Sequence, residues 1–323
     1  MRKFLTSGLV RWSITAALVI YAASYLKRDD IRELIHPYHA LLLLWVAAAL
    51  VVLVALNAIR WLLVARALTL QIPWGQSLHW TMIGHFFNQV VPSSIGGDVM
   101  RGLLAGRWTG DMPGAVTSIA LERIVGFMAL LALIVIGQPL LIARLNDLSL
   151  SWLALIFALG ALCIILLPFV VGPFLERHFP GRAVNVVRRF CNDARRLIAS
   201  PMLASLVLLG AFVMHGSTLL LTATIANQLG AHVSFLDVLL VMPTIMLVAS
   251  LPISIGGWGV REAGLAVGFT ALGQPASVAV ATSIVIGVGG FISALPGAVA
   301  WGLLAAPEAS REPGDMGRST ETA

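Results

Sequence analysis

The chain has 323 residues, of which 59% are hydrophobic and only 11% are charged, and its formal net charge is +6. A soluble core cannot hold this much apolar surface, so the composition excludes a water-soluble domain and predicts that lipid surrounds the protein. Apolar runs at 40–56, 124–136, 151–171 and 202–221 approach or reach the ~20 residues that cross a bilayer. No run alternates like a barrel strand, so we predict an all-α, polytopic membrane bundle of about eight helices or more.

Taken in chain order, the predicted elements form one membrane domain over residues 1–306 and a disordered polar tail over 307–323. The first helix has a basic start like a signal peptide, but Arg11 within it favours a retained helix. We expect helices or broken hairpins at the following residues: 4–26, 40–67, 76–91, 99–108, 115–136, 150–171, 201–227, 235–271 and 275–305.

The segment 173–200 differs in character from the apolar runs around it. It carries six arginines against Glu176 and Asp193, and apolar residues from Val184 to Leu197 recur at helical spacing. This pattern predicts an amphipathic basic helix that lies on anionic lipid headgroups in the cytoplasm, although a mere topological anchor is the alternative. Counting crossings from it places both termini on the cytoplasmic side of the cell (inner) membrane.

A ten-residue motif occurs twice in the chain. P-S-S-I-G-G-D-V-M-R, at 92–101, returns 160 positions later as P-I-S-I-G-G-W-G-V-R, at 252–261, with six of ten positions identical. Proline ends a helical hydrogen-bond ladder and a glycine pair permits a sharp reversal, so each copy predicts a broken re-entrant hairpin. With the basic segment inside, the repeats at 40–136 and 201–305 run in opposite directions, as inverted repeats of transporters do. Close helix packing at the glycines is the alternative reading.

The polar residues near the two motifs predict a cavity that binds an anionic headgroup, since guanidinium groups suit phosphate oxygens and are costly in hydrocarbon without a partner. The candidates for headgroup binding are Arg60, Arg101, Arg123 and Arg261. Counter-charge or proton coupling is assigned to Asp98, Glu122 and Glu262. The predicted hinges are Pro92, Gly96, Gly97, Pro252, Gly256 and Gly257, and the predicted cavity-lining residues are Asn88, Gln89, Ser94 and Ser254.

Glu122 and Arg123 interrupt an apolar helix as neighbours that point about 100° apart, so each needs another partner. We expect Asp98 to pair with Arg123, and Arg101 or Arg60 to pair with Glu122. Whether this network is structural or functional is left open, as is an interfacial role for the arginines that end the motifs. Trp258 replaces Asp98 in the second copy, so we expect one half to bind charge and the other mainly to gate.

The two motifs, together with Glu122-Arg123 after T-S-I-A-L, resemble the flippase-like family of the lysylphosphatidylglycerol synthase membrane region, from about residue 4 to 305. The resemblance implies lipid handling. In bifunctional members this region is similar to a flippase for aminoacylated phosphatidylglycerol, and a separate C-terminal domain makes that lipid. The resemblance carries over onto six positions: Asp98, Arg101, Glu122, Arg123, Arg261 and Glu262. Because the chain stops at Ala323, we expect no lysyltransferase activity.

These observations predict a lipid-binding flippase whose partner is a membrane phospholipid with an anionic headgroup or a lipid-linked precursor. A lipid-modifying transferase or hydrolase using Asp98 or Glu122 as base is an alternative, and an accessory subunit of a lipid or glycan pathway is another. No nucleotide motif supports ATP drive, and we expect no cofactor, metal or nucleic acid. Cys163 and Cys191 indicate neither a disulfide nor a metal site, and a homo-oligomer or pathway-enzyme partner is left open.

Overall fold

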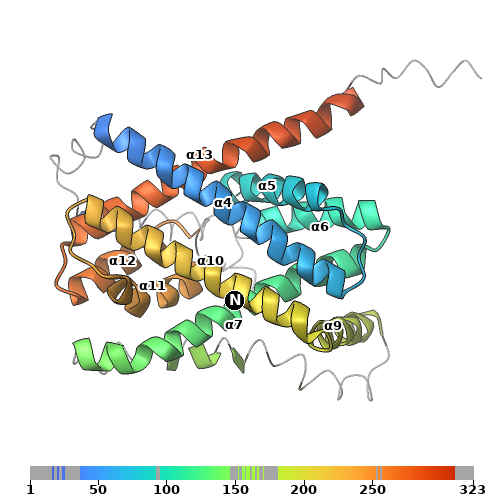
Figure 1. Cartoon of the computed structure of the whole chain (residues 1–323), viewed down its shortest axis with the longest axis horizontal. Helices are drawn as coiled ribbons and strands as arrows, with labels where there is room; N and C mark the ends of the chain where they lie inside the picture. The colour runs from blue at the N-terminus through green and yellow to red at the C-terminus, as the bar shows by residue number, and fades with distance from the viewer. Residues whose placement is uncertain are drawn as a thin grey trace, which may run out of the picture.

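The computed structural model describes residues 37–91, 95–145, 181–251, 254 and 257–309, with isolated positions between 17 and 25 and between 152 and 170. All regular structure in these ranges is α-helical, which confirms the predicted fold class (Figure 1). The helices are α4 (Pro37–Ala67), α5 (Trp74–Val90), α6 (Gly96–Thr109), α7 (Met112–Leu145), α9 (Arg182–Ile198), α10 (Pro201–Gln228), α11 (Phe235–Ala249), α12 (Val260–Ala271) and α13 (Ala276–Ala309).

Several predictions fall outside the described residues. These are most of the helices at 4–26 and 150–171, the tail beyond residue 309, and Pro92, Ser94, Pro252 and Gly256. Helix α13 continues to Ala309, three residues beyond the predicted end of the membrane domain at residue 306, and the domain boundary itself stays a prediction. Pro307 does not stop the helix, since the φ angle of proline is compatible with a helix and only one backbone hydrogen bond is lost.

Four of the described helices, α4, α7, α10 and α13, are long and apolar enough to cross a membrane. Large apolar side chains on them point outward, including Leu44, Val52, Leu220 and Leu295, as lipid contact requires. By contrast α5, α6, α11 and α12 have 12 to 17 residues. At 1.5 Å per residue they are about 18 to 26 Å long, short of the ~30 Å hydrocarbon core. They pack as the pairs α5–α6 and α11–α12, in the places where the sequence predicts broken hairpins.

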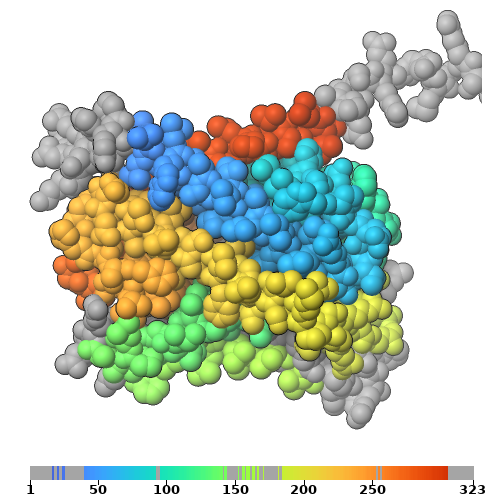
Figure 2. Space-filling view, in the orientation of Figure 1, coloured from blue at the N-terminus to red at the C-terminus, as the bar shows by residue number. Residues whose placement is uncertain are grey.

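Two quartets of helices, α4–α7 and α10–α13, pack in the same pattern. In each quartet the consecutive helices contact one another. The second helix of each quartet also contacts the last helix of the other: α5 contacts α13, and α11 contacts α7. The equivalent helices α4 and α10 also contact each other, and Figure 2 shows them side by side across one face. Arg60 lies against Gly210, whereas Val46 shares a core cluster with Ile225, so the two helices run antiparallel. Antiparallel equivalents are what inverted repeats require, and their sidedness in the membrane stays a prediction.

The ends of both motif regions meet on one glycine-rich turn of α13. Gln89, at the end of α5, lies against Gly290, and Trp258, just before α12, lies against Gly287. Gly287 and Gly290 are three residues apart, which is less than one helical turn. In Figure 1 the pair α5–α6 lies to the right and the pair α11–α12 to the left, with α4 and α10 crossing between them. The two broken elements therefore approach each other inside the bundle.

The basic helix α9 packs its apolar side on protein rather than on lipid. Ala194 and Leu197 are buried in the same core cluster as Trp61 and Val207. Helices α4, α7 and α10 cover these residues and remove them from solvent. The predicted place of the segment on anionic headgroups stays a prediction.

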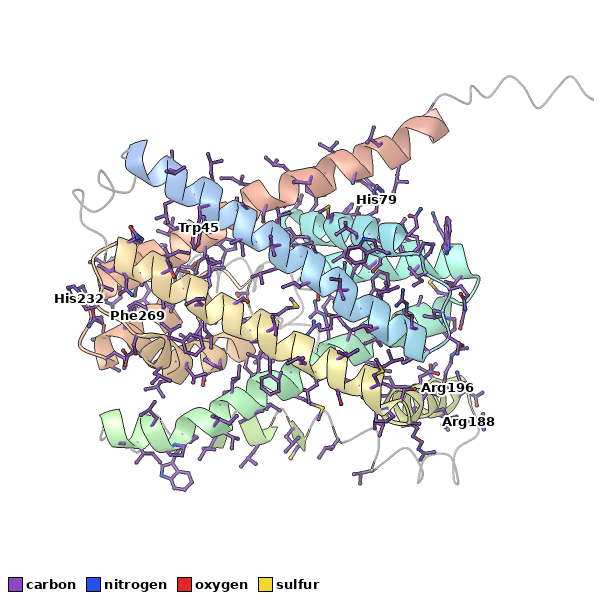
Figure 3. The ribbon with its side chains drawn as sticks, in the orientation of Figure 1. Trp45, His79, Arg188, Arg196, His232 and Phe269 are labelled. Atoms are coloured by element: carbon purple, nitrogen blue, oxygen red, sulfur yellow. The ribbon has the colours of Figure 1, made fainter. Side chains whose placement is uncertain are left out.

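The basic side of α9 stays exposed. Figure 3 shows Arg188 and Arg196 projecting from α9 at the edge of the bundle. Arg189 pairs with Asp111 at 2.5 Å and so ties α9 to the turn between α6 and α7. Burial raises the pKa of the Asp193 carboxyl, while Arg189 and Arg196 act in the opposite direction. Helix α9 is thus fixed to the bundle, and Arg188 and Arg196 point away from it.

The contact between α5 and α6 generates a first prediction, because a Cβ atom on Gly97 would overlap the backbone carbonyl oxygen of Gly84. Gly97→Ala should therefore lower the free energy of unfolding by about 1 to 3 kcal/mol, the usual cost of overpacking. Thermal unfolding of the purified protein in detergent measures this. Gly102→Ala on the same helix is the matched control, because its Cβ would lie 3.6 Å from Ile119, an ordinary contact. Equal stability of the two variants would contradict the close approach of α5 and α6.

Candidate functional site

A cluster of five charged side chains joins α4, α6 and α7, and all but Arg123, which is 32% exposed, are largely buried. Glu122 of α7, which is 1% exposed, accepts from Arg60 of α4 through Oε1 and from Arg101 of α6 through Oε2, the latter at 2.9 Å. Asp98 accepts from Arg101 at 2.8 Å through Oδ1 and pairs with Arg123 through Oδ2. The expected pairs of Asp98 with Arg123, and of Glu122 with Arg101 and Arg60, are all present.

Neighbouring residues fix the orientation of the Arg101 guanidinium. Its carbon lies 5.1 Å from the centre of the Trp61 ring, and the indole nitrogen of Trp61 donates to Ser118 at 3.0 Å. The aliphatic part of Arg101 lies against Gly84, where a Cβ atom would come within 2.9 Å of it. The ring of Trp61 on α4 and the backbone of Gly84 on α5 therefore hold the Arg101 side chain in place.

A cavity of 230 Å³ opens beside this cluster, between α4, α5, α6 and α10. Its lining combines amide, hydroxyl, imidazole and charged groups with an apolar wall: Leu50, Leu53, Val54, Asn57, Thr81, Gly84, His85, Asn88, Asp98, Arg101 and Met214. Arg101 is 3% exposed, and its Nη1 is buried with no hydrogen-bond partner among the described residues. A buried cationic donor without an acceptor is costly, so Arg101 brings an incompletely paired positive charge to the edge of the cavity.

The second motif builds a smaller and self-contained arrangement. Arg261 donates through Nε to Ser283 at 2.7 Å, and Ser283 donates to Glu262 at 2.6 Å. Glu262 also accepts from the backbone nitrogen of Gly259 at 2.5 Å, at the start of α12. The Arg261 guanidinium lies 5.3 Å from the Trp258 ring, so tryptophan packs here where the first motif has Asp98. The halves therefore differ chemically, as the sequence predicts.

The predicted lining residues divide between the cavity and other environments. Asn88 lines the cavity and accepts from the backbone nitrogen of Gly97 at 2.8 Å. Gln89 and Ser254 are not among the described residues that line this cavity. Gln89 is one residue further round α5 and faces Gly290 of α13, and Ser254 is buried in the second motif.

The four arginines predicted to bind the headgroup lie in three different environments. Only Arg101 lines the cavity, whereas Arg60 and Arg123 lie behind it in the ion-pair cluster and Arg261 belongs to the second motif. The predicted hinge glycines Gly96 and Gly97 open helix α6. Gly257 has a φ of 79° in the turn before α12, a conformation that favours glycine.

Three polar lining residues, Asn57, Thr81 and His85, are not among the site residues predicted from the sequence. A 2.8 Å hydrogen bond joins His85 to Ser293 of α13. The two residues are 208 positions apart in the chain, so the sequence pattern does not reveal this contact. One signal was present: Thr81, His85 and Asn88 recur at intervals of four and three residues, which places them on one face of α5.

The shared carboxylate generates a second prediction. Glu122→Gln removes the negative charge between Arg60 and Arg101 and leaves two buried guanidinium groups close together. We expect the free energy of unfolding to fall by about 3 to 5 kcal/mol, as for other broken buried ion pairs. Chemical unfolding of the protein in detergent measures this value. In the double variant with Arg60→Met the loss should be smaller than the sum of the two single losses, and strict additivity would contradict the ion pair.

Comparison with known proteins agrees with an architecture of membrane-spanning helices. No curated protein sequence matches the chain. The family model described as the lysylphosphatidylglycerol synthase TM region matches residues 8–297, which include every described helix of the two quartets except the last residues of α13. The chain therefore belongs to the family of the lysylphosphatidylglycerol synthase transmembrane region.

Proposed function

We propose that this protein translocates a membrane lipid with an anionic headgroup, and that the headgroup binds in the cavity beside Arg101. Family membership itself indicates a membrane protein related to lipid metabolism or transport. One observation carries the finer proposal: Arg101 lines a cavity, and its guanidinium has a buried nitrogen, Nη1, with no acceptor among the described residues. A phosphate oxygen of a lipid supplies that acceptor.

The surroundings of Arg101 support a lipid rather than a soluble anion. One wall of the cavity, from α4 and α10, is apolar and consists of Leu50, Leu53, Val54 and Met214. The opposite wall, from α5 and α6, supplies Arg101 and neutral polar groups such as Asn88. A lipid has the same division, with an anionic headgroup joined to apolar chains.

The carboxylates favour transport over the enzymatic alternative. A general base needs an oxygen within reach of the proton that it removes. Both oxygens of Glu122 accept from arginines, and both oxygens of Asp98 are paired with Arg101 or Arg123. These carboxylates serve as counter-charges that hold the arginines, so we assign them no role as a catalytic base.

The packing of the two quartets supports a mechanism of alternating exposure. Antiparallel equivalent helices let the two broken elements approach the bundle interior from opposite sides. In this proposal the headgroup occupies the first motif, while Trp258 and the paired Arg261 of the second motif close the path. Movement at the glycines that open α6 then exposes the headgroup to the other leaflet.

Reconstitution into vesicles tests the proposed transport. Phosphatidylglycerol labelled on an acyl chain is supplied in both leaflets, and an impermeant reductant quenches the label on the outside. We expect the protein to expose the inner label, and Arg101→Ala to slow this by about tenfold or more through loss of a charged hydrogen bond.

Arg107→Ala is the matched control, because Arg107 is exposed in the last turn of the same helix. Size-exclusion profiles show whether each variant is folded. Product analysis of the same vesicles detects any lipid modification. No label movement above empty vesicles, or an altered lipid product, would contradict the proposal.

The orientation of the chain is part of the proposal, because α9 should face the cytoplasm. In a variant with Cys163→Ser and Cys191→Ser, Arg188→Cys provides one exposed thiol on α9. An impermeant maleimide should label it in inverted vesicles and fail to label it in intact cells. His232→Cys, in the turn between α10 and α11 at the other end of α10, is the companion site and should show the reverse pattern. Labelling of Arg188→Cys in intact cells would reverse the assigned orientation.

A further inference from the structure

Helix α9 carries a strip of exposed polar side chains on the side that faces away from the bundle. The strip consists of Asn185, Arg188, Arg189, Asn192, Arg195 and Arg196. Their spacing of three, four or seven residues places them on one side of the helix. Asp193 is the one carboxylate in α9, and only 4% of its surface is exposed. Helix α9 therefore presents cations outward and keeps its anion behind them.

A basic recess opens where this strip meets two turns of the bundle, the turn that joins α4 to α5 and the turn that joins α6 to α7. Polar residues in and beside these turns line the recess: Thr69, Gln71, Thr109 and Asp111. Helix α9 contributes Arg189, Asp193 and Arg196, which also line a hollow beside Arg188 on its outer face. Three segments that lie far apart in the sequence therefore build one site.

The two carboxylates of the recess differ in how fully they are satisfied. Asp111 accepts from the backbone nitrogen of Gly114 at 3.1 Å through Oδ1, and from Arg189 at 2.5 Å through Oδ2. Asp193 accepts from Arg196 at 3.3 Å through Oδ1. The Oδ2 atom of Asp193 is buried without a hydrogen bond, and the Nε atom of Arg189 lies 3.8 Å from it. The recess therefore holds a buried acceptor that the described residues do not satisfy.

The arginines of the recess have donors to spare, since each guanidinium has five N–H groups. Arg188 bonds only the neutral side chain of Asn185 among the described residues, and Arg189 and Arg196 each donate one hydrogen bond to a carboxylate. Figure 3 shows Arg188 and Arg196 at the edge of the bundle, where a ligand can reach them. A ligand that satisfies the whole recess carries an anionic group for the arginines and a hydrogen-bond donor for Asp193.

The position of the recess favours a lipid headgroup over a soluble anion. Three helices that are long enough to cross a membrane have an end here: α4 ends at Ala67, α7 begins at Met112 and α10 begins at Pro201. Large apolar side chains are exposed around the same ends: Trp108, Met112, Ile198 and Met202. Tryptophan and basic residues at the ends of membrane-spanning helices are typical of the headgroup region.

We propose that α9 and the two turns form a lipid site at the membrane surface. In this site the phosphate of a phospholipid headgroup binds Arg188, Arg189 and Arg196, and a hydroxyl or ammonium group of the same headgroup donates to Asp193. Arginine suits the phosphate because its planar fork can donate two hydrogen bonds to one anion.

This site is separate from the cavity beside Arg101, with which it shares no lining residue. Thr109 follows Arg101 by eight residues on α6, which is about 12 Å along the helix axis. The inference therefore goes beyond the proposed function and does not depend on transport.

Native mass spectrometry of the full-length protein tests the site, with phosphatidylglycerol as the probe. A variant with both Arg188→Gln and Arg196→Gln should bind lipid at this site about tenfold more weakly, through loss of charged hydrogen bonds, and should retain one lipid fewer than the wild type. Arg195→Gln is the matched control, because Arg195 is exposed on the same helix and lines neither hollow. Arg101→Ala should also keep this lipid, since Arg101 lies outside the recess.

Two lipids of equal charge test the role of Asp193. Phosphatidylmethanol has the phosphate of phosphatidylglycerol but no hydroxyl group on its headgroup. In the Arg101→Ala background, phosphatidylglycerol should be retained over phosphatidylmethanol by about tenfold. Adding Asp193→Leu should remove this preference, because no acceptor remains for the hydroxyl group. Loss of folding lowers the binding of both lipids and cannot imitate a change in their ratio.

A soluble competitor separates the two sources of a phosphate ligand. Glycerophosphoglycerol has the headgroup of phosphatidylglycerol without acyl chains, and it should not displace the lipid at equal concentration. Displacement as effective as by the lipid would overturn the assignment to a lipid.

The remaining outcomes are equally distinct. Equal lipid binding by the Arg188→Gln/Arg196→Gln variant and by Arg195→Gln would overturn the site. Equal retention of the two lipids of equal charge would overturn the role of Asp193. A failed vesicle transport assay would overturn the proposed function and leave this site standing.

Discussion

The carboxylate of Glu122 is the constraint on which the arrangement of the first half depends. It lies on α7 and accepts from Arg60 of α4 and from Arg101 of α6, so three helices meet at one buried anion. In a bilayer no water replaces such a partner, and the two guanidinium groups need it to remain inside. The relative positions of these helices are thus set by charge as well as by packing. The cavity beside Arg101 takes its shape from this requirement.

The second motif shows the same sequence pattern with its arginine paired inside the motif. Arg261 is paired with Glu262 and hydrogen-bonded to Ser283, so its charge is balanced within the motif. Trp258 supplies a large ring where the first half has a carboxylate. An ancestral duplication would have supplied both copies with the same glycines and the same terminal arginine. The side chains between them now differ: a carboxylate and a cavity lie beside the arginine of the first half, and a tryptophan ring packs near the arginine of the second.

The sequence predicts the helices and the ion pairs well, because both are strongly constrained in lipid. The predicted helix at 40–67 appears as Pro37–Ala67, and the interrupted segment 235–271 appears as two short helices. Asp98 and Glu122 find their expected partners since few opposite charges are available at that depth. The lining of the cavity was harder to predict, because it depends on how α5 is rotated against its neighbours. Thus Asn88 lines this cavity, whereas Gln89, its neighbour in the chain, faces Gly290 of α13.

The glycine-rich turn of α13 has a consequence for how the two halves behave in time. Trp258 rests on Gly287 and Gln89 rests on Gly290, with no Cβ atom on the helix to separate either side chain from the backbone. Rotation of α13 about its own axis displaces both neighbours together. A rearrangement that starts in one half is therefore transmitted mechanically to the other through a rigid element, and the two halves cannot change shape independently.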